Sequence, residues 1–133
     1  MRTREQVNVD AQGRCPCLSG LPYSECCRPF HDGVAAPTAE KLMRSRYSAY
    51  ALANTAYLAD TWHPDFRPDR IEVDEGIRWY RLDILGRTGG GLLDSAGTVE
   101  FVAHFRQDGS AGSQHENSRF VRENGRWFYL DAV

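Results

Sequence analysis

The sequence of 133 residues has almost no lysine and no long hydrophobic run. Only Lys41 among its 16 basic residues is lysine, and the formal net charge of −2 gives no electrostatic basis for binding nucleic acid. No apolar stretch approaches the roughly 20 residues that span a bilayer, so we expect no membrane segment. The N-terminal residues lack the apolar stretch of a secretory signal, which favours a cytoplasmic location.

Cysteine is absent from most of the chain, because all four cysteines fall within the thirteen residues from Cys15 to Cys27. Between the two pairs lies a turn-rich segment with Ser19-Gly20 and Pro22. Four thiolates gathered by such a turn form a closed tetrahedral shell, which suits a structural Zn²⁺ with no open position for water. The expected zinc ligands are Cys15, Cys17, Cys26 and Cys27.

The cysteine spacing leaves two alternatives open. A zinc ribbon usually separates both of its cysteine pairs by two residues, and here one pair is separated by one residue and the other is adjacent. Two disulfides are possible in an oxidising compartment, and four cysteines allow three pairings. A redox-active thiol pair is the other alternative, although no Cys-x-x-Cys is present.

Four segments of the chain carry a resemblance to known proteins. The run CPCLSGLPYSECC resembles the SEC-C motif, a short zinc knuckle with Cys-x-Cys, eight residues, and then Cys followed by Cys or His. The segments LMRSRYSAY, YLADTWHP and HENSRFVRENGRWFYLD resemble the YchJ family of small uncharacterised bacterial proteins. That family joins a SEC-C motif to a domain similar to nuclear transport factor 2. The resemblance therefore implies a zinc knuckle and linker over 1–33 and such an α+β domain over 34–133.

The pattern of the second region agrees with an α+β fold, in which N-terminal helices pack on a curved antiparallel sheet. Thr38 is a plausible N-cap for one helix, and a second short helix begins near residue 54 and ends at Pro64. Residues 63–77 look like a loop, 89–91 like a flexible break and 108–113 like another loop. Strands are expected over 78–87, 98–106, 114–123 and from 126 onward.

The dipeptide Asn124-Gly125 predicts a type I′ hairpin, which fixes the pairing of the last two strands. In that register Phe120 lies opposite Tyr129, Ser118 opposite Asp131, and Arg119 opposite Leu130. The fold that the resemblance implies leaves a conical pocket between helices and sheet, and we expect the hairpin face with Glu116 to line it. The expected ligand-binding residues are Tyr47, Tyr50, Trp62, Glu116, Ser118, Phe120 and Tyr129.

Catalysis is a separate hypothesis, suggested by similar folds such as ketosteroid isomerase and scytalone dehydratase. The catalytic candidates are Glu116, His115 and His104, since a buried carboxylate or a histidine can act as a general base. A glutamate in a strand beside arginines is more often part of an ion pair. Arg44 and Arg46 flank the helical stripe and could grip an anion, although exposed arginines are common.

Three functions follow from these features. The first is a zinc-binding protein with a small-ligand pocket, whose knuckle docks on a protein or the ribosome. The second is an enzyme of the isomerase, dehydratase or hydrolase type. In the third, the zinc braces the N-terminus against the main domain. We expect no membrane partner and either a monomer or a homodimer.

Overall fold

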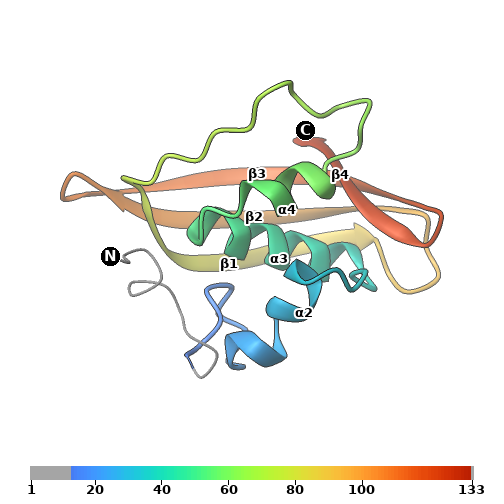
Figure 1. Cartoon of the computed structure of the whole chain (residues 1–133), viewed down its shortest axis with the longest axis horizontal. Helices are drawn as coiled ribbons and strands as arrows, with labels where there is room; N and C mark the ends of the chain where they lie inside the picture. The colour runs from blue at the N-terminus through green and yellow to red at the C-terminus, as the bar shows by residue number, and fades with distance from the viewer. Residues whose placement is uncertain (1–12, 133) are drawn as a thin grey trace.

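A computed structural model describes residues 13–132; residues 1–12, which the sequence predicts to be unstructured or loosely attached, lie outside it. Its largest element is a curved antiparallel sheet with strand order β1-β2-β3-β4. Helices α3 (Ala39–Ala51) and α4 (Thr55–Asp60) lie over one face of this sheet (Figure 1). The strands are β1 (Arg78–Gly89), β2 (Ala96–Gln107), β3 (Ser110–Glu123) and β4 (Arg126–Ala132).

Both helices begin at a side-chain cap. The Thr38 hydroxyl accepts a hydrogen bond from the Lys41 amide at 3.1 Å, which confirms the predicted cap, and the Asn54 side chain does the same for α4. Helix α4 ends at Asp60 and not at Pro64 as predicted. The chain after α4 pairs with β4, because the Tyr129 amide donates to the Thr61 carbonyl at 2.9 Å. Because the backbone at Thr61 bonds to β4, the helix ends before Pro64.

The sheet differs from the prediction at both ends of β2. Asp108 and Gly109 both have positive φ, 54° and 81°, so a tight hairpin replaces the predicted loop over 108–113. The glycines predicted to form a flexible break instead pack closely. Gly90 accepts a hydrogen bond from the Ala39 amide at 2.9 Å, and a Cβ on Gly90 would lie 2.8 Å from the Ala39 side chain. The start of α3 is therefore fixed against the β1–β2 connection.

The predicted C-terminal hairpin is confirmed at its turn, where Glu123 pairs with Arg126 and Phe120 with Tyr129. Beyond Phe120 the predicted register is wrong. A bulge pairs Arg119 with Asp131 and Ser118 with Ala132 in place of Leu130 and Asp131. The extra residue on β4 is Leu130, which stays buried. As a result, Asp131 lies opposite Arg119 and not opposite Ser118, and it forms an ion pair with Arg119 at 2.7 Å.

The N-terminal knuckle contains η1 (Tyr23–Glu25) and α2 (Arg28–His31), so part of the predicted linker is helical. In Figure 1 the knuckle lies alongside α3, and Cys15, Cys17 and Cys27 belong to one core cluster with residues of α3 and the sheet. The shared members of this cluster include Leu42, Met43, Tyr47, Leu82, Val99 and Phe120.

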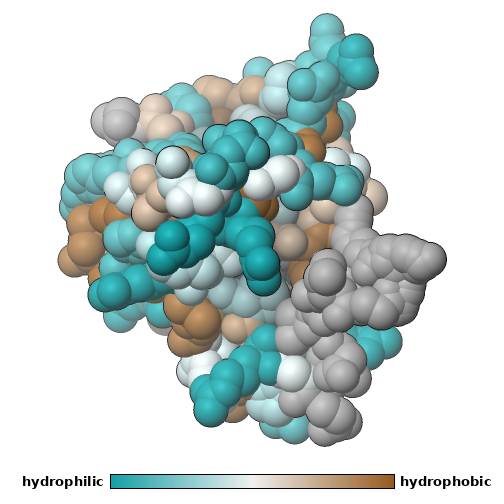
Figure 2. Space-filling view, turned by 90° about the vertical axis from the view of Figure 1, so that its left-hand side faces the viewer, coloured by the Kyte–Doolittle hydropathy of each residue, from teal (hydrophilic) through white to brown (hydrophobic). Residues whose placement is uncertain are grey.

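The surface of one end of the molecule is largely hydrophilic, with small separate hydrophobic patches (Figure 2). None of the helices formed by residues 13–132 is long and apolar enough to cross a membrane.

Candidate metal centre and ligand pocket

The four cysteine side chains converge on one point. Their sulfur atoms all lie within 4.8 Å of one another, with 3.5 Å from Cys17 to Cys26 and 4.0 Å from Cys26 to Cys27. A tetrahedral metal with four bonds of about 2.3 Å to sulfur separates neighbouring sulfurs by about 3.8 Å. The observed separations fit that geometry, so the cluster is arranged to bind a metal ion.

Backbone turns bring the two cysteine pairs together. The Cys15 amide donates to the Leu21 carbonyl at 2.9 Å, and Leu18 takes a positive φ of 64° in the turn between them. Cys26 and Cys27 lie at the junction between η1 and α2, with Cys27 as the N-cap of α2. Because Cys26 precedes the helix and is not part of it, the two adjacent side chains reach the same point.

Hydroxyl groups surround the sulfurs. The Ser48 hydroxyl of α3 donates to Cys27 Sγ at 3.3 Å and lies 3.5 Å from Cys15 Sγ. The Ser19 hydroxyl lies 3.0 Å from Cys26 Sγ. Hydrogen bonds to sulfur orient metal ligands and stabilise their thiolate form. Ser48 is fully buried, so α3 supplies an outer shell for the cluster.

The thiols influence one another's ionisation. Hydrogen bonds to Cys15 and then to Cys27 hold the pKa of Cys17 far below its usual range, whereas burial raises the pKa of Cys26 to about 11. Several thiolates cannot stay ionised this close together unless a cation offsets their charge. The chemistry of this donor set therefore fits a thiophilic divalent metal, with Cys15, Cys17, Cys26 and Cys27 as its ligands.

A cavity of about 160 Å³ lies between α3 and the sheet. Six of the seven predicted ligand-binding residues line it, and Trp62 is not among the lining residues. Trp62 instead packs edge-on against Tyr129, with 5.1 Å between the ring centroids. Whether these residues bind a ligand stays a prediction. The six are Tyr47, Tyr50, Glu116, Ser118, Phe120 and Tyr129.

Arg46, one of the two arginines that we expected to grip an anion or to be exposed, also lines this cavity. Its side chain is 5 % exposed, and its guanidinium donates to the Leu58 carbonyl at 2.9 Å and the Thr61 hydroxyl at 2.7 Å. The guanidinium carbon lies 4.5 Å from the Tyr129 ring centroid. The sequence held a signal for this placement, because Arg46 is four residues before Tyr50 on the same helix face.

The three catalytic candidates lie on two sides of the sheet. Glu116 lines the cavity, where it accepts hydrogen bonds from Gln114 and, at 3.4 Å, from Ser118. His104 and His115 lie on neighbouring strands, and their side chains are on the opposite face of the sheet from Glu116. His104 pairs with Asp83 at 2.9 Å, and His115 pairs with Glu100 at 2.6 Å. Neither histidine is a lining residue of this cavity. The structure therefore does not bring the three candidates together.

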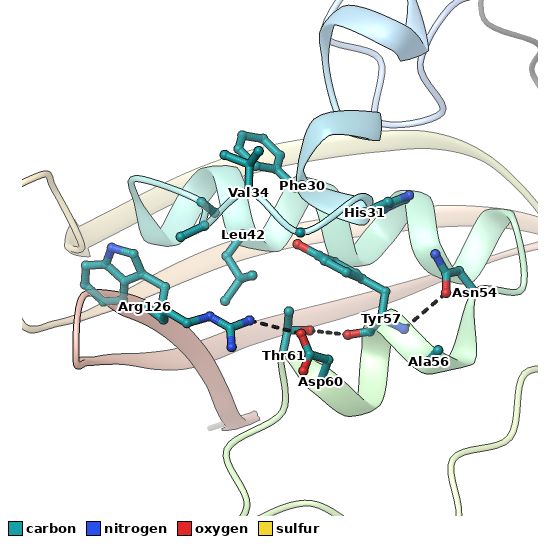
Figure 3. A pocket seen from close by; sticks show the side chains of 14 residues that line it. Phe30, His31, Val34, Leu42, Asn54, Ala56, Tyr57, Asp60, Thr61 and Arg126 are labelled. Carbon is teal, nitrogen blue, oxygen red and sulfur yellow. Dashed lines mark hydrogen bonds and ion pairs between the residues drawn. The ribbon is translucent and has the colours of Figure 1, made fainter.

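A larger cavity of about 370 Å³, which no sequence pattern indicates, lies beside segment 30–36, α4 and β4. Figure 3 shows Arg126 paired with Asp60, at 3.0 Å, and the side chains of Asn54 and Thr61 bonded to the backbone of Tyr57. Both ring nitrogens of His31 also have partners, the Tyr23 hydroxyl at 2.7 Å and the Ser45 carbonyl at 2.8 Å. These groups are less available to a ligand than those of the first cavity.

The helices over a curved sheet and the adjoining cysteine cluster define an NTF2-like α+β protein with a SEC-C-type knuckle. Residues 38–132 match the family model described as "YchJ, middle NTF2-like domain". A UPF0225 protein of Corynebacterium glutamicum is 55% identical over 117 residues, covering 87% of this chain and 93% of the relative. Another, from Chromobacterium violaceum, is 42% identical over 138 residues and covers 100% and 98% of the two chains. The chain belongs to the YchJ-like family.

Two solved structures share the fold. The solution structure of RPA3114, a SEC-C motif containing protein from Rhodopseudomonas palustris, has a TM-score of 0.77 and 38% identity, covering 90% of this chain and 96% of that one. The crystal structure of a SEC-C motif containing protein from Psychrobacter arcticus has a TM-score of 0.71 and 30% identity, covering 88% and 80%.

Proposed function

We propose that this chain is a cytoplasmic small-molecule-binding protein in which a structural Zn²⁺ holds the knuckle against α3. The observation that carries the proposal is that α3 contacts the cysteine cluster and also forms one wall of the cavity. Met43 and Tyr47 belong to the core cluster that contains the cysteines, and both line the cavity on the sheet side. A metal in the knuckle would thus support one wall of the binding site.

Zinc is the metal that best fits the donor set. Four thiolates in a closed shell are typical of structural zinc and leave no position for a substrate or an activated water. Cys15, Cys17 and Cys27 are at most 1 % exposed, which favours a structural role. Free thiols in such a site suit a reducing compartment, and this supports the cytoplasmic assignment.

The cavity has the composition of a ligand site. Aromatic rings and Met43 supply most of its wall, and a small number of polar residues line it, among them Arg46, Glu116 and Ser118. Apolar walls with a few convergent polar groups are the usual make-up of small-molecule sites.

Native mass spectrometry of the protein purified under reducing conditions, without added metal, tests both parts. We expect one zinc per chain, with a small molecule retained in part of the population. The Cys26→Ser variant should lose the zinc. A protein with four reduced thiols and no metal would refute the structural zinc.

An enzymatic function is the second candidate, and Glu116 favours it. It is the one catalytic candidate that lines the cavity, close to the hydroxyl of Ser118. A carboxylate in a largely apolar cavity can serve as a general base. If a ligand is identified, turnover that is lost in Glu116→Gln while binding persists would support this candidate.

A further inference from the structure

The inference concerns Arg46 and rests on the proposed ligand pocket. Arg46 is a charged side chain held inside the protein at the wall of the cavity. Burial lowers the pKa of Arg46 to about 10, so its guanidinium stays positively charged at neutral pH. Across residues 13–132 no carboxylate forms an ion pair with it. The charge of Glu116 in the same cavity offsets part of the cost of burying this guanidinium, and an anion that binds directly to Arg46 would lower the cost further.

The contacts of Arg46 use only part of its hydrogen-bonding capacity. Both of its hydrogen bonds, to the Leu58 carbonyl and the Thr61 hydroxyl, come from Nη1. The rings of Trp62 and Tyr129 lie 5.0 Å and 4.5 Å from the guanidinium carbon and partly offset the charge. Nε and Nη2 make no hydrogen bond to any described residue, and these two donors form the edge that binds carboxylates in a bidentate manner.

Tyr47 is a second polar group of the cavity without a partner. The residue is 5 % exposed, and its buried hydroxyl makes no hydrogen bond. Burial raises the pKa of Tyr47 above its usual value, and the nearby Arg81 amide offsets this in part. The phenol therefore keeps its proton and can donate it to an acceptor in the cavity. Buried hydroxyls normally have a partner, so an absent acceptor is indicated.

The shape of the cavity limits the rest of the ligand. A volume of about 160 Å³ is below the 300–1,000 Å³ of sites for drug-sized molecules, so the ligand is small. Glu116 in the same cavity disfavours a second negative charge on the ligand. The wall offers rings against which a planar group can pack: Tyr47, Tyr50, Trp79, Phe101, Phe120 and Tyr129.

We propose that the cavity binds a small aromatic monocarboxylate, whose carboxylate lies on the free edge of Arg46 and accepts a hydrogen bond from Tyr47. Its ring packs among the aromatic side chains between α3 and the sheet. Arg46 is thus the residue that selects an anion over a neutral ligand of the same shape.

The test is an NMR titration of the ¹⁵N-labelled zinc-loaded chain with benzoate, with its neutral isostere benzamide, and with the dianion terephthalate. We expect benzoate to shift the amides of α3 and β3 at the lowest concentration. Benzamide should bind about tenfold or more weakly, since hydrogen bonds to a charged group contribute more than those to a neutral one. Terephthalate should also bind more weakly than benzoate because of Glu116.

Variants separate the two donors. Arg46→Met should remove the preference for benzoate over benzamide, and Tyr47→Phe should weaken benzoate binding by about three- to tenfold. Tyr47→Phe removes a hydroxyl that bonds to nothing, so its fold should persist even if Arg46→Met fails to fold. The matched control is Tyr80→Phe, which alters a 45 % exposed ring that does not line the cavity.

Two outcomes would overturn the inference in distinguishable ways. Equal binding of benzoate and benzamide, unaffected by Tyr47→Phe, would refute the carboxylate class and leave the proposed pocket standing. The pocket itself would be refuted by two negative results together. None of the three compounds would shift a cavity amide at millimolar concentration, and native mass spectrometry would detect no retained ligand.

Discussion

At the scale of single residues, the structure depends on small polar side chains that join segments far apart in the chain. Ser48 connects α3 to two cysteine sulfurs, and His31 connects α2 to the Ser45 carbonyl. Neither contact can be read from the sequence, because each requires the relative position of two elements to be known. Ser48 and His31 nevertheless fix how the knuckle lies on α3.

Ser48→Ala should weaken metal binding. Loss of an outer-shell hydrogen bond to a metal ligand typically lowers affinity about 10- to 100-fold. Competition with a chromophoric chelator measures the change. Ser24→Ala is the matched control within the knuckle, because no hydrogen bond of the Ser24 hydroxyl is found among the described residues. Equal affinities of the two variants would contradict a role for Ser48.

His31 should make the fold sensitive to mild acid. Its Nε2 donates to the Ser45 carbonyl, its Nδ1 shares a hydrogen bond with the Tyr23 hydroxyl, and burial lowers the pKa of His31, which favours the neutral ring. Because the folded pKa lies below the unfolded value of about 6.5, this contribution to stability is present above that pH. It is lost as the pH falls through the lower, folded value.

Chemical denaturation at pH 7.5 and pH 5.5 checks this expectation. Wild type should lose more unfolding free energy over this interval than His31→Gln, which cannot titrate. Any acid-induced loss of metal occurs in both proteins and is removed by taking the difference. Identical pH dependences would show that His31 does not titrate with folding.

At the scale of elements, turn chemistry and helix caps could be predicted, but the strand register near the bulge could not. The Asn124-Gly125 turn fixed the pairing only as far as Phe120. The bulge that follows depends on Leu130 being buried while the Trp62 indole donates to its carbonyl at 3.1 Å, a contact across 68 residues. Asp108-Gly109 is an equally clear local signal for a tight hairpin, and the loop predicted over 108–113 is wrong for that reason.

Gly125→Ala should lower the free energy of unfolding by about 1–2 kcal/mol. Gly125 has a φ of 80°, and no atom lies within 4 Å of an added Cβ, so the cost comes from the left-handed backbone alone. Urea denaturation measures it. Gly86→Ala is the control, since its site is equally open without a positive φ, and it should not destabilise. A destabilisation shared by both variants would contradict this explanation.

At the scale of the whole molecule, the knuckle and the α+β domain share one hydrophobic core. The sequence predicted the zinc knuckle over 1–33 and the domain over 34–133 as consecutive units, and it left open whether they touch. Composition alone could not decide this, since apolar knuckle residues suit either arrangement. Composition alone also does not place Arg46 inside the protein, because an arginine is usually exposed; only its position four residues before Tyr50 on α3 indicates the burial.

Removal of the metal should therefore destabilise the entire chain. A tightly bound metal contributes several kcal/mol of stability, so the Tm should fall by about 10 °C or more in a strong chelator under reducing conditions. Differential scanning calorimetry measures the shift, and the Cys26→Ser variant, with no zinc to lose, should show none. An unchanged Tm for wild type would indicate that the knuckle does not contribute to the stability of the domain.

The position of Met43 and Tyr47, between the cysteine cluster and the cavity, has a thermodynamic consequence. If metal binding fixes these two side chains, it also raises the affinity of the cavity for its ligand. Such coupling is reciprocal, so the ligand must tighten metal binding by the same factor. Ligand occupancy would then rise and fall with the loading of the metal site, since the same two side chains belong to both.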